Sequence, residues 1–287
     1  MGKFILSAFA DEIGDSLDLQ MDTLDVYQIK HIEMRGVDRK NVTEHSIEQM
    51  KEYKKRLDAR GFALSAVGSP IGKYPIDKPF EPHFDLFKHT LEIACTMEAP
   101  YIRLFSFFME DGEQDRYADA VTERMAAFTN EAKKCNIRLL HENEKGIYGD
   151  TPLRCKQIIE QTNSPYLQGI FDPANFVQCG VDTVEAFDIM EPYIEYMHIK
   201  DALYQSGEVQ PAGFGDGRLP QILGRLKDAG FEGFLSLEPH LGNFSGAQAL
   251  EKDGHFNDLP EGGPKLFGIA AEALIKILNE IGADYCG

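Results

Sequence analysis

The sequence predicts a single (β/α)8 barrel that occupies the whole chain, residues 1–287. Three observations support this fold. Short apolar runs of the β type alternate with longer amphipathic runs, as parallel βα units require. The alternation occurs eight times along the chain. A barrel of this kind needs about 250 residues, so 287 residues fit one barrel better than two ordinary domains.

The expected strands are mostly continuous apolar runs, as strands buried on both faces should be. They span residues 3–9, 31–35, 63–67, 101–105, 137–141, 167–171, 194–199 and 233–237. An open doubly wound sheet also alternates strands with helices, but its first turn is usually rich in glycine. Residues 8–14 read AFADEIG and lack the GxGxxG pattern, which makes a dinucleotide-binding fold the less favoured alternative.

The stretches between the strands carry helical patterns. Residues 46–60 form one amphipathic stretch, and the glycine at 61 is typical of a helix C-cap. Residues 115–134 form another, in which Val121, Met125 and Phe128 share a face. Residues 265–281 are the expected eighth helix.

Residues 238–264 form the longest stretch without an expected element. A loop of this length is usually a functional lid or a floppy connection. Since the loop follows the last strand, it would lie at the catalytic face of a barrel, which favours the lid.

The composition is that of a folded globular protein, with 43% hydrophobic and 26% charged residues. The net charge of −18 and the lack of a long Lys/Arg track argue against a nucleic-acid partner. No apolar stretch approaches the roughly 18 residues of a membrane span, and none precedes the first strand, so neither a membrane partner nor export is expected. The five cysteines lie without CxxC spacing, which suits free thiols in the cytoplasm.

The last four strands each end on a residue that can bind a metal ion: Glu142, Asp172, His198 and Glu238. Because the carboxyl ends of barrel strands face one shared mouth, these side chains should converge there. Each residue alone is more often a surface or turn residue, but the repetition on four consecutive strands favours a metal site. Three carboxylates would repel one another without a cation. The set suits one divalent ion, which can be Mn²⁺, Mg²⁺, Co²⁺ or Zn²⁺.

Five motifs resemble those of the xylose isomerase-like TIM barrels, a family that includes sugar isomerases and epimerases, inosose dehydratases and the type IV endonucleases. The motifs are LHENE at 140–144, FDPAN at 171–175, HIKD at 198–201, GFGDG at 213–217 and LEPH at 237–240. The endonucleases need further histidine ligands after strands three and four, where residues 67–69 and 105–107 contain none. This departure argues against DNA repair.

The resemblance implies roles for individual residues. In ketose 3-epimerases of the family, a Glu, an Asp, a His and a Glu hold the metal, and these roles fall on Glu142, Asp172, His198 and Glu238. The family also has a substrate-holding His three residues after the Asp, and Asn175 stands in that place here. The departure weakens a strict 3-epimerase assignment and makes Asn175 a candidate substrate contact.

The implied reaction begins with removal of a proton next to a carbonyl, through a metal-stabilised enediolate. Glu142 and Glu238 are the expected acid and base. The leading hypothesis is an isomerase or epimerase of a small sugar or polyol. A keto-inositol dehydratase starts with the same step, and a barrel that binds metal and sugar without turnover is a third reading. Barrels of this family often pair, so a homo-oligomer is among the expected states.

Two residues share the strand parity of a ligand and are candidate substrate contacts. Lys200 lies two residues after His198, where it either holds a substrate oxygen or forms an ion pair with Asp201 or Glu238. Glu144 lies two residues after Glu142 and is either a second acid or base, a support for the site, or a plain loop carboxylate.

Two arginines lie in or at the end of expected strands, where they are costly unless paired or turned to a polar mouth. Arg35 and Arg103 are therefore candidates to clamp a carboxylate or phosphate, although an ion pair with Glu33 is the plainer explanation for Arg35. His240 and Phe214 are candidates for the substrate wall. The histidines outside the mouth are expected at the surface, among them His31, His45, His83 and His89.

Overall fold

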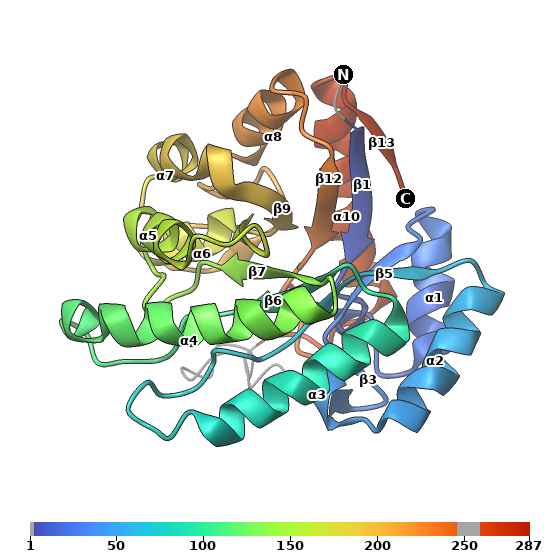
Figure 1. The fold of residues 1–287 in the computed structure, drawn as a ribbon. Helices are drawn as coiled ribbons and strands as arrows, with labels where there is room; N and C mark the ends of the chain where they lie inside the picture. The colour runs from blue at the N-terminus through green and yellow to red at the C-terminus, as the bar shows by residue number, and fades with distance from the viewer. Residues whose placement is uncertain (1–2, 246–258) are drawn as a thin grey trace.

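Eight parallel strands close into one barrel in the computed structural model, which describes residues 3–245 and 259–287 (Figure 1). The barrel strands are β1 (Lys3–Ala8), β2 (His31–Met34), β5 (Ala63–Gly68), β6 (Tyr101–Leu104), β7 (Arg138–Glu142), β8 (Leu167–Phe171), β9 (Ile194–Ile199) and β12 (Gly233–Leu237). They pair in this order around the ring, and β12 pairs with β1 to close it. The predicted (β/α)8 barrel is confirmed, and every strand lies within one residue of its expected ends.

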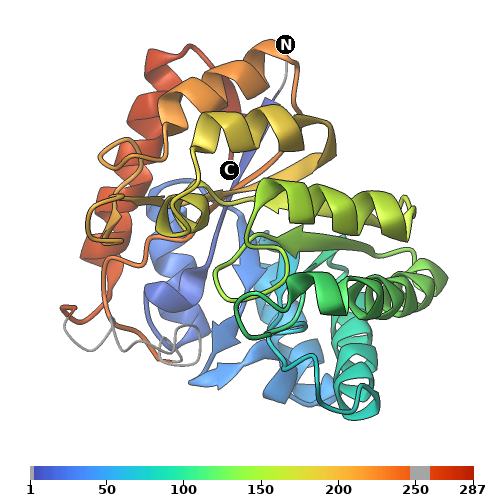
Figure 2. The ribbon, with the colours of Figure 1, turned by 90° about the vertical axis from the view of Figure 1, so that its left-hand side faces the viewer.

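Helices cover the outside of the barrel (Figure 2). They are α1 (Leu17–Val26), α2 (Ile47–Ala59), α3 (Glu81–Met97), α4 (Gln114–Lys134), α5 (Pro152–Thr162), α6 (Pro173–Gln178), α7 (Thr183–Met190), α8 (Leu219–Asp228) and α10 (Pro264–Glu280). Ser46 caps α2 by accepting a hydrogen bond from Gln49 N, as helix N-caps commonly do. The expected apolar face of α4 is buried at Val121, Met125 and Phe128. Among the described residues, no helix is long and apolar enough to cross a membrane.

Side chains fill the interior of the barrel. A functional site is therefore expected at the carboxyl ends of the strands. Ser65 Oγ lies 2.6 Å from Ser7 Oγ and 2.9 Å from Tyr196 Oη, which joins three strands by hydrogen bonds. Leu140 and Ile170 pack beside Tyr196. This filled layer is the floor on which the functional side chains stand.

Short elements that the sequence did not reveal complete the fold. The hairpins β3–β4 (Gly36–Val37, Lys40–Asn41) and β10–β11 (Asp201–Ala202, Val209–Gln210) and three 3-10 turns, η1 (Ala10–Glu12), η2 (Val42–Glu44) and η3 (Glu191–Tyr193), lie between the main elements. At the carboxyl end, β13 (Asp284–Cys286) pairs with residues 3–5 of β1. Since β2 pairs with β1 only at Ser7 and Ala8, β13 fills the gap between β1 and β2. Such two- or three-residue strands are too short to show a period in the sequence.

The expectation of surface histidines is wrong for two of the four. His45 and His83 are only 2% and 5% exposed. His45 Nε2 lies 3.2 Å from Val37 O, and His83 Nε2 accepts a hydrogen bond from Gly72 N at 2.8 Å. Each buried ring thus has a backbone hydrogen-bond partner, as buried polar groups usually do.

The long loop after β12 lies only partly within the described residues. Its two described ends meet, because Asn243 N donates to Pro260 O and Gly262 N donates to Asn243 O, both at 2.7 Å. Residues 246–258 lie outside the described part, so the expected lid stays a prediction.

Candidate metal centre

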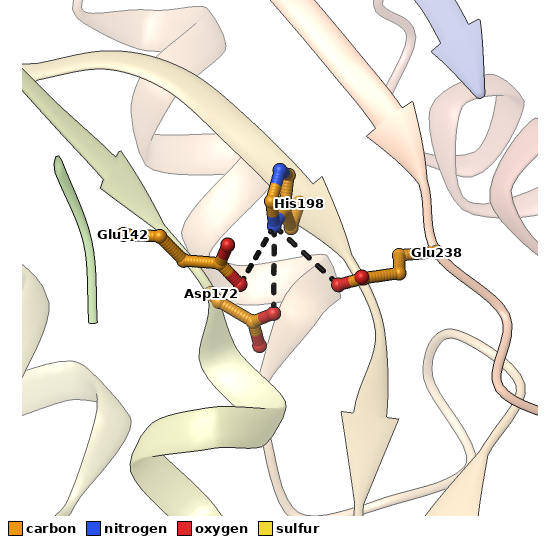
Figure 3. A group of neighbouring side chains, drawn as sticks. All are labelled: Glu142, Asp172, His198 and Glu238. Carbon is orange, nitrogen blue, oxygen red and sulfur yellow. Dashed lines mark ion pairs between the residues drawn. The ribbon is translucent and has the colours of Figure 1, made fainter. Parts of the chain in front are cut away.

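Four neighbouring strands bring the predicted ligands to one point (Figure 3). Glu142 is the last residue of β7, Asp172 follows β8, His198 lies in β9 and Glu238 follows β12. All four are at most 2% exposed. One ligand atom from each lies within 4.8 Å of the others. The local sequence fixes Asp172 further, because its Oδ1 caps α6 by accepting from Asn175 N at 2.9 Å.

The imidazole of His198 is at the centre of the group. Its Nδ1 lies 3.1 Å from Glu142 Oε1, 3.5 Å from Glu238 Oε2 and 3.7 Å from Asp172 Oδ2. Figure 3 draws these three ion pairs as dashed lines that meet at the ring. Burial alone would lower the pKa of His198, but the charges of Glu142 and Glu33 outweigh it and hold the pKa well above its usual value.

Two buried atoms at this point lack hydrogen-bond partners, which indicates that the residues fit a cation. His198 Nδ1 and Asp172 Oδ2 are both buried and make no hydrogen bond of good geometry, although Nδ1 forms an ion pair with Glu142 and Oδ2 forms one with Lys200. Buried polar groups almost always have partners, so such atoms require an explanation. A divalent ion held by the three carboxylates and Nδ1 supplies it, and oxygen with one imidazole suits Mn²⁺, Mg²⁺, Co²⁺ or Zn²⁺.

Each of the two glutamates gives one oxygen to the centre and the other to an arginine. Arg103 Nη1 donates to Glu142 Oε2 at 2.7 Å, and Arg35 Nη1 donates to Glu238 Oε1 at 2.8 Å. The ring of Phe9 lies between the guanidinium groups, 4.5 Å from Arg35 Cζ and 5.2 Å from Arg103 Cζ. Although burial favours protonation, His198 and Arg103 hold the pKa of Glu142 below its usual value. The arginines therefore hold the two glutamate oxygens that do not face His198, Glu142 Oε2 and Glu238 Oε1.

The remaining partners of Arg35 differ from the ion pair with Glu33 that the sequence suggested. Arg35 donates to Asp11 at 2.8 and 3.0 Å and to Glu12 at 3.0 Å, whereas Glu33 contacts His198. Asp11 and Glu12 were missed in the sequence. A signal was present, because they follow the first strand just as the ligands follow the later strands.

Lys200 lies against two of the ligands. Its Nζ is 3.0 Å from Glu238 Oε2 and 3.1 Å from Asp172 Oδ2. Of the two ion pairs considered from the sequence, that with Glu238 is formed. Asp201 instead accepts hydrogen bonds from the backbone N–H groups of Gly213, Gly215 and Gly217, and so ties down the glycine-rich motif.

Asn175 connects two ligand strands. Its Nδ2 donates to Glu142 Oε1 at 3.1 Å and to Asn143 O at 2.8 Å. Together with the cap on Asp172, these bonds orient two of the ligand carboxylates. Whether Asn175 also touches a substrate stays a prediction.

A cavity of about 400 Å³ lies next to the two arginines that bind Glu142 and Glu238, although none of the four ligands is among its described lining residues. Arg35, Arg103, Lys73, Phe105 and Phe244 are among the residues that line it. This volume is within the range of about 300 to 1,000 Å³ found for small-molecule sites. The predicted contacts Arg35 and Arg103 thus face both the glutamates and a space large enough for a sugar.

The other predicted contacts lie at different distances from this cavity. The side chain of Glu144 is 12% exposed and pairs with Lys73 at 3.2 Å. Burial raises the pKa of Glu144, although Lys73 opposes this effect. His240 Nε2 lies 3.3 Å from Glu238 Oε1 and 3.4 Å from Glu12 Oε1. Phe214 is 65% exposed and is not among the described residues that line the 400 Å³ cavity, so its role in a substrate wall stays a prediction.

Comparisons with known proteins identify the family and the fold. The family model for the xylose isomerase-like TIM barrel matches residues 25–257. No curated protein matches the chain by sequence.

Solved structures with the same fold cover nearly the whole chain. An L-ribulose 3-epimerase has a TM-score of 0.74 at 15% identity, over 98% of this chain and 96% of its own. The IOLI protein with a bound zinc atom has a TM-score of 0.73 at 16% identity, over 97% and 99%. A probable 3-DHS dehydratase from Bacillus anthracis has a TM-score of 0.68 at 16% identity, over 95% and 98%.

Proposed function

Because the chain belongs to the xylose isomerase-like TIM barrel family, we propose that it is a divalent-metal-dependent isomerase or epimerase of a small sugar or polyol. The observation that carries the proposal is the buried convergence of Glu142, Asp172, His198 and Glu238 next to the two arginines that line a cavity of sugar size. The similar structures include an L-ribulose 3-epimerase and a zinc-bound protein, which supports this reading.

The chemistry requires a cation and two groups that move protons. A divalent ion, when bound, draws electrons from adjacent substrate oxygens and acidifies the C–H bond between them. Glu142 and Glu238 reach the same point from different strands, so one can accept the carbon-bound proton and the other can return one. Arg103 and Arg35 restrain these carboxylates through their outer oxygens. We assign to Lys200 Nζ the donation of a hydrogen bond to a substrate oxygen that gains negative charge.

The side chains that line the cavity would recognise the substrate. Phe105 and Phe244 offer apolar faces to the C–H surfaces of a sugar, and Lys73 and Arg103 offer N–H donors to its hydroxyl groups. Glu144, held by Lys73, supplies an acceptor nearby. Small apolar surfaces with a few fixed polar groups are the usual composition of such a site.

A lyase that removes water is the second candidate. It begins with the same proton removal, and Asn175 replaces the histidine that holds the substrate in the family's 3-epimerases. A dehydratase is also among the structures that share the fold. The two reactions differ only in whether a hydroxyl leaves the neighbouring carbon.

A panel of ketoses and inososes in D2O, with Mn²⁺, Mg²⁺, Co²⁺ or Zn²⁺ added, separates the candidates. Incorporation of deuterium at one carbon without loss of water supports the isomerase or epimerase. Loss of water supports the lyase. Binding of a sugar without any exchange supports a barrel without turnover. Glu142→Gln and Glu238→Gln should each abolish exchange, and full exchange in either variant would contradict its acid–base role.

A further inference from the structure

Glu33 is a buried carboxylate that reaches the metal centre from a distant strand. It belongs to β2, which is separated from β9 by β1 and β12 on the shorter way around the ring. Its side chain is 0% exposed, and its Oε2 and Oε1 lie 3.2 and 3.4 Å from His198 Nε2. Within the described part of the chain, all hydrogen bonds and ion pairs of the Glu33 side chain are to this nitrogen.

The strand next to β2, β5, carries one extra residue, Ser65, beside the position that presents this side chain. The pairing of β2 with β5 shifts by one residue between Ile32 and Glu33, so that Ile32 faces Leu64 but Glu33 faces Ala66. Bulges of this kind often lie next to active sites and redirect a side chain. The local irregularity and the buried contact therefore point to the same function for Glu33.

We propose that Glu33 is a positioning residue of the metal centre, which holds the proton of His198 on Nε2 and leaves the lone pair of Nδ1 for the cation. The proposal rests on the metal site of the proposed function and adds a residue to it. An ionised carboxylate can only accept a hydrogen bond, so its contact with Nε2 requires the proton there. A neutral imidazole has one N–H, and Nδ1 is then free to coordinate.

The opposite tautomer would work against metal binding. A proton on Nδ1 would face the oxygens of Glu142, Glu238 and Asp172, which attract it. Only a partner at Nε2 counters this preference in a neutral ring. Phe9 and Tyr196 also pack edge-on against the ring, at 5.1 and 5.9 Å between ring centroids, and these contacts restrain only its orientation. Carboxylates that accept from the second nitrogen of a metal-bound histidine also make it a stronger ligand.

The test measures metal binding and not turnover. Wild type, Glu33→Gln and Glu33→Asp are titrated with Co²⁺, with calorimetry for affinity and visible absorption for the ligand field. We expect the Kd of Glu33→Gln to rise about 10- to 100-fold, the usual effect of removing such a partner. We also expect its cobalt spectrum to change, which a role limited to fold stability would not cause. Glu33→Asp keeps the charge and should restore part of the affinity.

Glu144→Gln is the matched control. It removes one mostly buried carboxylate charge from the same mouth, but Glu144 pairs with Lys73 and makes no described contact with His198. A much smaller rise in Kd there, with an unchanged cobalt spectrum, supports a specific role for Glu33.

Equal effects in Glu33→Gln and Glu144→Gln, or wild-type affinity and spectrum in Glu33→Gln, overturn the role of Glu33 alone. If Glu33→Gln does not fold, Glu33→Asp decides, because unchanged binding there also overturns the role. If wild type itself binds no divalent ion, the metal site of the proposed function is wrong and the role of Glu33 is wrong with it.

Discussion

The guanidinium of Arg103 donates a hydrogen bond of 2.7 Å to Glu142 Oε2, and both side chains are almost fully buried. The other oxygen of the Glu142 carboxylate, Oε1, faces His198. A single glutamate is thus shared between a fixed internal cation and the proposed metal position. This division would let Glu142 combine the proposed acid–base role with the proposed role of an ordered metal ligand.

Replacing the arginine should leave a buried charge unpaired. We expect Arg103→Met to lower the free energy of unfolding of the metal-free protein by about 3 kcal/mol, as is typical when one partner of a buried pair is lost. The loss should be smaller with metal bound, because the cation still compensates Glu142. Urea denaturation with and without Mn²⁺ measures both values.

The exposed pair of Arg138 and Glu195 provides the control, because side chains there are 49% and 24% exposed. Arg138→Met should cost at most about 1 kcal/mol, as surface ion pairs do. Equal losses for Arg103→Met and Arg138→Met would refute the idea that Arg103 compensates a buried charge.

Metal binding should stabilise the fold through the four ligands. A ligand at about 100 times its Kd adds about 2.7 kcal/mol to the free energy of unfolding. We expect Mn²⁺ to raise the melting temperature of wild type and to have little effect on Asp172→Asn. This variant keeps the cap on α6, since an amide oxygen can still accept from Asn175 N. The same metal-dependent shift in both proteins would show that Asp172 is not a ligand.

The pattern of strand ends was enough to predict that the four candidate ligands converge. In the sequence, an apolar run precedes each of Glu142, Asp172, His198 and Glu238. Because the carboxyl ends of parallel barrel strands face one mouth, residues at these ends are expected to meet there. Strands of at least four residues were also predictable from their apolar runs.

Contacts across the barrel interior were not predictable in the same way. Glu33 and Arg35 are two residues apart and both point inward, which suggested an ion pair, but they bind His198 and Asp11 respectively. These partners belong to other strands, and which of them meet depends on register and on the shift at Ile32. A single sequence does not specify that geometry.

The buried ring of His83 should make stability depend on pH. Burial, with Arg124 nearby, lowers the pKa of His83 from 6.5 to about 4. Below about pH 6.5 the unfolded chain binds a proton that the folded protein does not, so stability is lost as the pH falls from about 6.5 to about 4.

His83→Gln keeps an acceptor for Gly72 N but removes this titration. Between pH 7 and pH 4.5, its free energy of unfolding should fall by about 2 kcal/mol less than that of wild type. Chemical denaturation at both pH values measures the difference. An identical pH slope in the two proteins would contradict the assignment.

The turn that carries Lys73 into the cavity wall depends on a glycine. Gly72 has φ +88°, and a Cβ there would lie 2.0 Å from Phe105 O, a backbone atom that cannot move aside cheaply. Gly72→Ala therefore combines left-handed strain with a clash, and should cost more than about 2 kcal/mol in the free energy of unfolding. Gly61→Ala is the control, because its φ is +70° but nothing lies within 4 Å of the added Cβ. Denaturation should show a cost of only about 1 kcal/mol there, whereas equal costs at both sites would mean that the loop after β5 yields to the methyl group.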